Sequence, residues 1–173
     1  MIFLTGANGF IGRNFVEEFF EQDLTCKCLI QTGSVAAFVS FLAELEARNG
    51  KRNSCIEIVE GSLPESQNFK ASFFDVEAII HCAAVVCAGS AEEIRHTNIS
   101  STEVLLEYAK QSGIQKFVFL SSAAVLSPNG GHYTNSKRVA EEKVSEQLSG
   151  TKIDYLILRP ALVTGPYDKK NIS

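Results

Sequence analysis

Short apolar runs alternate along this chain with longer amphipathic segments. The apolar runs are rich in Ile, Val, Leu, Phe and Cys, and they predict strands at 1–4, 25–30, 55–60, 78–82, 116–120 and 153–158. The amphipathic segments repeat apolar residues at spacings of three and four, which predicts helices at 10–21, 35–48, 92–111 and 133–148. The stretch 61–74 is weaker and predicts at most a short helix after Pro64.

This alternation of strand and helix indicates a single α/β domain over residues 1–173. We expect a parallel sheet of about six strands, covered by helices on both faces. Right-handed crossovers would make the sheet doubly wound, with its binding crevice at the carboxyl ends of the strands. Residues that carry chemistry should therefore lie just after the strands.

Composition and charge narrow the choice of partners. The 173 residues, of which 45% are apolar and 21% charged, suit one globular domain. A net charge of -4 with interspersed signs gives no basic stripe, which argues against nucleic acid as a partner. The apolar runs are all shorter than the roughly 18 residues of a membrane span. The first apolar run is too short for a signal sequence, so we expect a cytoplasmic protein that contacts no membrane.

The five cysteines show no metal-ligand spacing with the histidines, and they lie mostly within apolar runs. We interpret them as buried, reduced thiols and expect no metal. Cys26 and Cys28 would share one face of a strand, which suits packing better than redox chemistry.

The first strand runs directly into a turn at residues 5–12, Thr-Gly-Ala-Asn-Gly-Phe-Ile-Gly. This glycine spacing between a strand and an amphipathic helix is typical of dinucleotide binding, whereas an isolated glycine triplet would indicate only a tight turn. Gly6 would permit the turn, Gly9 would let backbone N–H groups approach a pyrophosphate, and Gly12 would let the helix pack closely. The helix N-terminus would then meet the phosphates.

Short motifs follow the later strands: His81-Cys82-Ala83-Ala84, Asn98-x-x-x-Thr102, Leu120-Ser121-Ser122, Tyr133-x-x-x-Lys137, and Arg159-Pro160 with Gly165-Pro166. Together with the glycine turn, they resemble the extended short-chain dehydrogenase/reductase superfamily and its NAD(P)-dependent epimerase/dehydratase family. The resemblance covers essentially the whole chain. It implies a Rossmann-type, NAD(P)-binding domain.

Four residues are candidates for catalysis. Tyr133 and Lys137 lie one helical turn apart, so the ammonium would lower the pKa of the phenol and make it an acid/base; the alternative is a solvated helix pair. The resemblance implies that Lys137 also donates to the nicotinamide ribose and that Ser122 orients the substrate oxygen. The alternative for Ser122, or for Ser121 beside it, is a strand-end cap. Asn98 resembles the asparagine that holds a water near the lysine, with a helix-cap-like polar contact as its alternative.

The resemblance also implies cofactor contacts from residues around the same crevice: Gly6, Gly9, Phe10, Ile11, Gly12, Gln31, Ser62, Leu63, Ala83, Ala84, Tyr133, Lys137 and Pro160. The small Ala83 and Ala84 would allow close approach of the cofactor. Pro160 resembles a proline that lies against the nicotinamide, although it also serves as a plain strand terminator. We expect His81 to pack at a strand end rather than to catalyse.

Two positions depart from the family pattern. Gln31 follows the second strand where an acid would hold an NAD ribose or an arginine an NADP phosphate, so NAD and NADP both stay open. Because an acid would repel the extra phosphate, its absence slightly favours NADP, with Arg13 or Lys27 as sources of positive charge. Ser62 stands in Gly-Ser-Leu where the family usually has Gly-Asp-Leu, so a hydroxyl or the backbone would contact the adenine.

Family members continue past the Gly165-Pro166 segment into a lobe that supplies most substrate contacts. This chain ends at Ser173, so the substrate lobe is missing from it, and whether the chain is a fragment stays open. The leading hypothesis is an NAD(P)-dependent oxidoreductase, epimerase or dehydratase that transfers hydride with a sugar nucleotide or another small carbonyl or alcohol substrate. The alternative is an NAD(P)-binding sensor or scaffold without chemistry. The resemblance is compatible with a homodimer formed through the helices that carry Asn98 and Tyr133.

Overall fold

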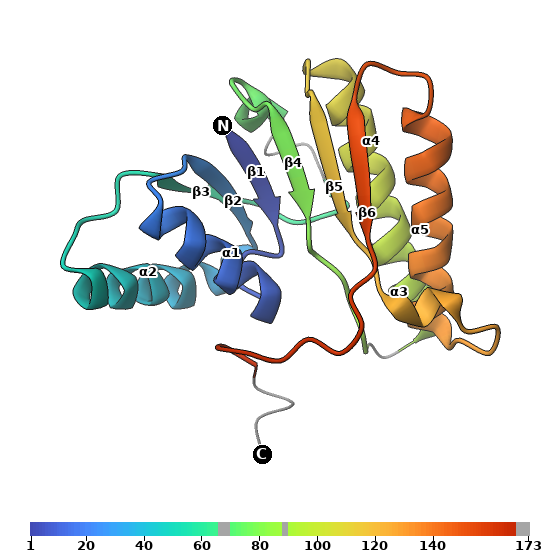
Figure 1. Cartoon of the computed structure of the whole chain (residues 1–173), viewed down its shortest axis with the longest axis horizontal. Coiled ribbons are helices and arrows are strands. Elements are labelled where there is room, and N and C mark those ends of the chain that lie inside the picture. Colours follow the sequence, from blue (N-terminus) through green and yellow to red (C-terminus); the bar gives the residue numbers. More distant parts are fainter. Residues whose placement is uncertain (66–69, 88–89, 169–173) are drawn as a thin grey trace.

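A single parallel sheet organises the chain (Figure 1). The computed structural model describes residues 1–65, 70–87 and 90–168. The strands run in the order β3-β2-β1-β4-β5-β6, and their bounds are β1 (Ile2–Thr5), β2 (Cys26–Ile30), β3 (Ile56–Glu60), β4 (Ala78–His81), β5 (Lys116–Leu120) and β6 (Asp154–Leu158). Each strand lies within one residue of its predicted bounds, and the expected doubly wound order is confirmed.

Five α-helices connect the strands: α1 (Phe10–Glu21), α2 (Val35–Asn49), α3 (Ala91–Arg95), α4 (Ser101–Gln111) and α5 (His132–Leu148). The helix expected at 92–111 is divided, because a π-helical turn at His96–Ser100 separates α3 from α4. Short 3-10 turns lie at Thr32–Ser34, Lys70–Phe73 and Ala123–Leu126. The short helix expected after Pro64 falls partly on residues 66–69, which lie outside the described residues.

The side chains of the strands alternate between two apolar cores. On β1, Phe3 packs in the core beneath α4 and α5, while Leu4 packs in the core beneath α1 and α2. Phe117 and Phe119 of β5 point to the first of these cores and are fully buried. β2 is buried along its whole length, as a strand covered on both faces should be.

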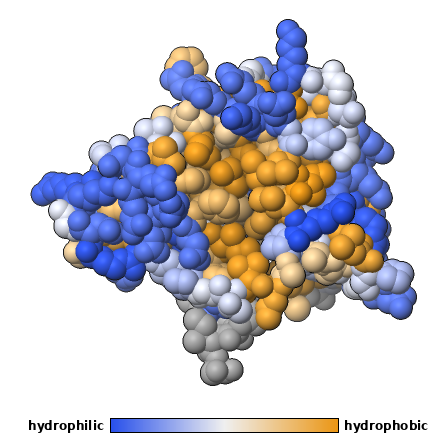
Figure 2. Space-filling view, in the orientation of Figure 1, coloured by the Kyte–Doolittle hydropathy of each residue, from blue (hydrophilic) through white to orange (hydrophobic). Residues whose placement is uncertain are grey.

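One part of the sheet is covered on a single face within the described residues. α1 and α2 lie over β1, β2 and β3, whereas the same face of β5 and β6 shows an apolar surface in Figure 2. On this face Leu156 pairs with Val118 and Leu158 with Leu120, and Leu156 is 53% exposed. The expectation of helices on both faces is therefore wrong for this part of the sheet.

The cysteines are all free thiols, and three of them are buried. The Sγ atoms of Cys26 and Cys28 lie 3.7 Å apart, on one face of β2 as expected. Cys82 is only partly buried and Cys87 is exposed, so the expectation of buried thiols is wrong for Cys87. The described residues contain no cluster of three or more His, Cys, Asp or Glu suited to a metal ion. None of the helices in the described ranges is long and apolar enough to cross a membrane.

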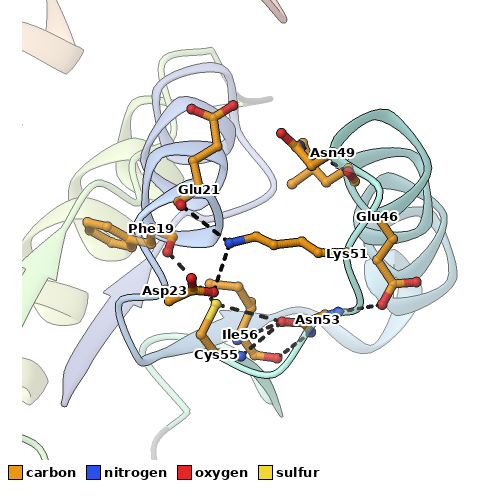
Figure 3. A network of polar contacts seen from close by, with 10 residues as sticks. Phe19, Glu21, Asp23, Glu46, Asn49, Lys51, Asn53, Cys55 and Ile56 are labelled. Atoms are coloured by element: carbon orange, nitrogen blue, oxygen red, sulfur yellow. Dashed lines mark hydrogen bonds and ion pairs between the residues drawn. The ribbon is translucent and has the colours of Figure 1, made fainter.

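A polar network lies at the amino ends of β2 and β3 (Figure 3). The Asn53 Oδ1 accepts from the backbone N–H groups of Cys55 and Ile56, at 3.2 and 2.8 Å. Its Nδ2 donates to the Ile56 carbonyl at 2.8 Å. Beside it, Lys51 donates to Asp23 at 2.8 Å and lies over the ring of Phe20. These contacts fix the start of β3 against the loop that follows α1.

Candidate active site

The glycine turn lies at the carboxyl end of β1, and its geometry requires glycine. Gly6 has a φ of +73°, and a Cβ there would lie 2.6 Å from the backbone nitrogen of Ala83. A Cβ on Gly12 would collide with the carbonyl oxygen of Gly6. Gly9 is extended, and a Cβ there would lie 3.2 Å from the same oxygen. The turn therefore excludes side chains at Gly6 and Gly12, and Gly6 and Gly9 line the cavities described below.

α1 begins immediately after Gly9, and its N-terminus fits an anion. Within the described residues, its first turn has neither a side-chain cap nor an acidic residue. The N–H groups of a first helical turn have no partner inside the helix, and the helix dipole is positive at this end. The turn thus offers the donors and the space that the pyrophosphate of NAD or NADP requires.

Two cavities extend from the glycine turn in opposite directions. The first, of about 360 Å³, runs over the ends of β2 and β3 and reaches α4. It is lined by seven of the residues proposed from sequence: Gly6, Gly9, Gln31, Leu63, Ala83, Ala84 and Asn98. The second, of about 460 Å³, runs over the ends of β4, β5 and β6 and reaches α5. It is lined by ten: Gly6, Gly9, Phe10, Ile11, Gly12, Ala84, Ser122, Tyr133, Lys137 and Pro160.

The sequence-based set is incomplete in both cavities. Ser62 is half-buried but lines neither of them. Residues that sequence reasoning missed directly follow or flank the proposed ones, including Thr97 and Ser101 around Asn98 and Ala161 after Pro160. Ala161 could have been identified because the loop after a parallel strand contributes several successive residues to the crevice. Ser101 could have been identified because residues three apart lie on the same face of a helical segment as Asn98.

Tyr133 and Lys137 of α5 face the second cavity. Lys137 is 2% exposed; its Nζ donates to the Leu120 carbonyl at 2.7 Å and lies 4.5 Å from the centroid of the Phe119 ring. Burial lowers the pKa of Lys137 to about 8. Burial also raises the pKa of Tyr133, which is opposite to the lowering expected from the nearby ammonium. Desolvation of the phenol therefore outweighs any attraction from Lys137 in this arrangement.

Ser122 makes the cap that was considered as its alternative, and it also lines the second cavity. Its Oγ accepts from the Ala124 backbone N–H at 3.2 Å and so caps the 3-10 turn that follows β5. The hydroxyl still has its own hydrogen to donate, and the residue lines the second cavity. Ser121 is buried and lines the same cavity. The cap orients Ser122 without removing its capacity to donate to a substrate oxygen.

Asn98 lies in the π-helical turn and lines the first cavity rather than the second. Its Oδ1 accepts from the Val85 N–H at 2.8 Å, and its Nδ2 donates to the Val85 carbonyl at 3.0 Å and to the Ser136 Oγ at 2.8 Å. Both amide hydrogens are therefore used within the protein. The structure does not bring Asn98 together with Tyr133 and Lys137 in one cavity. The Asn98 side chain does not cap a helix either, but ties the Val85 backbone to Ser136 of α5.

The end of β6 is tied to α5 beside Lys137. Arg159 donates to Glu141 through two nitrogens, Nε at 2.9 Å and Nη2 at 2.6 Å. Burial alone would raise the pKa of Glu141, but the hydrogen bonds from Arg159 hold it below its ordinary value. This bidentate pair fixes the start of the segment that leads to Pro160.

Comparison with known proteins decides the family. The chain matches the NAD dependent epimerase/dehydratase family over residues 2–173. It belongs to this family. Family membership confirms the resemblance stated from the motifs, the Rossmann-type fold, and NAD or NADP as the cofactor of the family.

Relatives within the family differ in activity. The chain is 26% identical over 172 residues to the ceramide reductase of Caulobacter vibrioides, covering 99% of this chain and 49% of the relative. It is 27% identical over 193 residues to the UDP-glucose 4-epimerase of Vibrio cholerae, covering 99% and 54%. The chain thus spans about half the length of the curated relatives that it matches.

Solved structures share the fold. UDP-glucuronic acid 4-epimerase from Bacillus cereus, in complex with NAD, superposes with a TM-score of 0.79 at 21% identity, over 96% of this chain and 57% of that one. A yeast methylglyoxal/isovaleraldehyde reductase complexed with NADPH gives a TM-score of 0.77 at 18% identity, over 96% and 59%. The shared part is a little under three fifths of each of these two chains.

Lys27 and Arg13 were considered as ligands of the additional phosphate of NADP, but both side chains are engaged by other groups of the protein. Lys27 is buried, and its Nζ donates to the Phe74 carbonyl at 3.0 Å, so it is wrong as a phosphate ligand. Arg13 donates to the Asn8 Oδ1 at 2.7 Å and lies over the ring of Phe41. Neither lines the first cavity, whereas Gln31 does and is exposed.

Proposed function

We propose that the protein is an NAD(P)-dependent oxidoreductase, epimerase or dehydratase whose cofactor is seated on the glycine turn. The observation that supports this most directly is the second cavity, which joins the N-terminus of α1 to Ser122, Tyr133 and Lys137. A site that places an anion-binding helix end beside a hydroxyl, a phenol and a buried ammonium is suited to proton and hydride exchange at one carbon–oxygen group.

The residues divide the work as follows. Bound NAD(P) supplies the hydride acceptor or donor. Ser122 donates a hydrogen bond to the substrate oxygen and orients it, while the Tyr133 hydroxyl exchanges a proton with that oxygen. Lys137, as an ammonium, stabilises the phenolate when it forms; its depressed pKa also lets it pass on a proton near neutral pH.

A small carbonyl or alcohol compound fits the described part of the site best. Among the described residues that line the second cavity, Lys137 is the one cationic side chain. The exposed side chains of Val86 and Leu162 add apolar surface to its wall. The diphosphate of a sugar nucleotide would need positive charge from outside this part of the chain. A homodimer, on the family resemblance alone, and a cytoplasmic location, on the sequence-based expectation alone, complete the proposal.

A second candidate is an NAD(P)-binding sensor or scaffold without chemistry. It is favoured by the engagement of Lys137 with the Leu120 carbonyl and by the raised pKa of Tyr133, because both oppose an ionised phenol. In this candidate the glycine turn and the first cavity keep their roles, but no proton is exchanged.

Calorimetry with NADH and NADPH, followed by turnover assays on a panel of aldehydes, ketones, alcohols and sugar nucleotides, tests these proposals. Binding together with turnover of at least one compound supports the enzyme. Binding without turnover across the panel supports the sensor. Failure to bind either cofactor would overturn both.

A further inference from the structure

A buried histidine lies between the glycine turn and the π-helical turn. His81, the last residue of β4, is 1% exposed. Its Nδ1 lies 2.7 Å from the Oγ1 of Thr5, the residue directly before Gly6. Its Nε2 lies 3.2 Å from the Oγ1 of Thr102, in the first turn of α4. The imidazole therefore joins β1 to the start of α4, which directly follows the π-helical turn that carries Asn98.

The direction of these hydrogen bonds follows from the donors available. Thr102 has one hydroxyl hydrogen and donates it to the Asn98 carbonyl at 2.8 Å, so its Oγ1 accepts from the Nε2–H of His81. The Nδ1 then carries no proton and accepts from the Thr5 hydroxyl. Thr5 in turn accepts from the Ala83 N–H at 3.2 Å. A single tautomer of His81 thus gives each donor and acceptor in this row of hydrogen bonds a partner.

The histidine is neutral in this setting. Burial, helped by the positive charge of Lys137, lowers the pKa of His81 to about 3. Protonation of Nδ1 would also change the Thr5 hydroxyl from donor to acceptor, so that the hydroxyl hydrogen would lose its partner. The tautomer is therefore held over the whole range in which an ordinary histidine titrates.

The row of hydrogen bonds through His81 reaches a different candidate functional segment at each of its two ends. At one end, Thr5 and Ala83 flank Gly6, whose Cα packs against Ala83 so closely that only glycine fits. At the other end, Asn98 donates to the Ser136 Oγ, which donates to the Tyr133 carbonyl at 2.8 Å. Thus five consecutive hydrogen bonds connect the turn before α1 to the turn that begins α5.

We propose that His81, as the neutral Nε2–H tautomer, is a positioning residue that couples the pyrophosphate-binding turn to Asn98 and to the backbone of Tyr133. This inference rests on the proposed binding of NAD(P) at the glycine turn. Binding of the cofactor then fixes Thr5, and His81 transmits that order to the segment that holds the phenol. The converse also holds: loosening Thr102 weakens cofactor binding.

Thr102 provides the cleanest test, because it is fully buried and lines neither cavity. In Thr102→Val the Nε2–H loses its acceptor, whereas Thr102→Ser keeps the hydroxyl. We expect Thr102→Val to weaken NADPH and NADH binding by about fivefold or more in calorimetry, and Thr102→Ser to stay within about twofold of wild type. Thr151→Val is the matched control, since it removes a hydroxyl bonded to Leu148 at the opposite edge of the sheet.

Thermal unfolding of the same variants separates coupling from general damage. A purely structural role predicts that Thr102→Val and Thr151→Val lower the melting temperature while both keep wild-type affinity, and that result would overturn the coupling. Equal losses of affinity in Thr102→Val and Thr102→Ser would overturn it as well. Failure of the wild-type protein to bind either cofactor would overturn the proposed function itself, a distinguishable outcome.

Nitrogen-15 NMR of histidine-labelled protein gives a second measurement, made on the wild-type chain. The His81 signals are identified by their absence in His81→Asn. We expect a protonated Nε2 and an unprotonated Nδ1, with neither shift changing as the pH falls through the ordinary histidine range. An Nδ1–H tautomer, or titration in that range, would contradict the proposed direction of the chain.

Discussion

The lysines near the two ends of the parallel strands have opposite environments: Lys51 lies at the amino ends, which we call the amino-end edge, and Lys137 at the carboxyl ends, the carboxyl-end edge. At the amino-end edge, Lys51 is 32% exposed, pairs with Asp23 and lies in a network whose polar groups are matched (Figure 3). At the carboxyl-end edge, Lys137 is 2% exposed and donates to a carbonyl, and its pKa falls to about 8. Lys51 is thus paired near water, whereas Lys137 is desolvated beside Tyr133 in the candidate site, where a perturbed pKa points to a functional role.

Substitutions at the carboxyl-end edge should lower turnover far more than substitutions in the amino-end network. Tyr133→Phe removes only a hydroxyl, and we expect it to lower turnover by about 10²- to 10⁴-fold, the contribution of a general acid/base. Cofactor affinity should stay close to wild type, because the ring and backbone are retained. Steady-state kinetics and calorimetry measure the two effects separately. Wild-type turnover in Tyr133→Phe would refute the acid/base role and leave the sensor as the better account.

Removing the buried charge should change how stability depends on pH. The pKa of Lys137 is depressed in the folded protein, from 10.5 to about 8, so the unfolded chain binds more protons between these values. Wild-type stability should therefore rise by roughly 3 kcal/mol as the pH increases through this window, and this contribution is lost again as the pH falls through 8.

Lys137→Met lacks this titration and isolates it from other alkaline effects. Denaturant unfolding at several pH values should show that the variant gains on wild type at neutral pH and that the gap closes towards pH 10.5. Turnover should be lost at every pH. A stability difference that stays constant with pH would show that the charge carries no folding cost.

The amino-end edge should show the reverse pattern, a stability effect without a functional one. Asn53→Ala leaves the N–H groups of Cys55 and Ile56 without their acceptor, which we expect to cost about 1–3 kcal/mol of unfolding free energy. Cofactor affinity and turnover of the folded protein should not change. Asn49→Ala is the matched control, because Asn49 is exposed and its side chain bonds only the carbonyl one turn earlier. Equal effects of the two substitutions would mean that the network adds no stability.

Sequence reasoning worked best where periodicity and sterics are local. The strand at 116–120 and the helix at 10–21 have their predicted bounds, since alternating Phe residues and a three-four repeat each define one face. Gly6 and Gly12 could also be assigned a steric task, because a strand-turn-helix leaves few positions for close approach. The alternation of strands and helices along the sequence was then enough to predict a parallel, doubly wound sheet.

Features that depend on distant contacts could not be predicted in this way. The π-helical turn interrupts a segment whose apolar spacing is that of one continuous helix, and it is stabilised by the contacts of Asn98 with Val85 and Ser136. Lys27 looked available for a phosphate, but its register on β2 buries it against the Phe74 carbonyl. The rise in the pKa of Tyr133 depends on burial, which spacing on a helix does not specify.

The smallest expected effect concerns the choice between cofactors at Gln31, an exposed residue of the first cavity. A neutral side chain here does not repel the additional phosphate of NADP, so we expect wild type to bind NADPH at least as tightly as NADH. Gln31→Glu should shift the ratio of affinities towards NADH by about five- to tenfold, the size of a charge interaction of roughly 1 kcal/mol. Gln22→Glu adds the same charge to an exposed site at the opposite edge and should leave the ratio unchanged, although both variants alter the net charge equally. An equal shift in both would trace the preference to the field of the whole protein, whereas a shift confined to Gln31→Glu would place it at the end of β2.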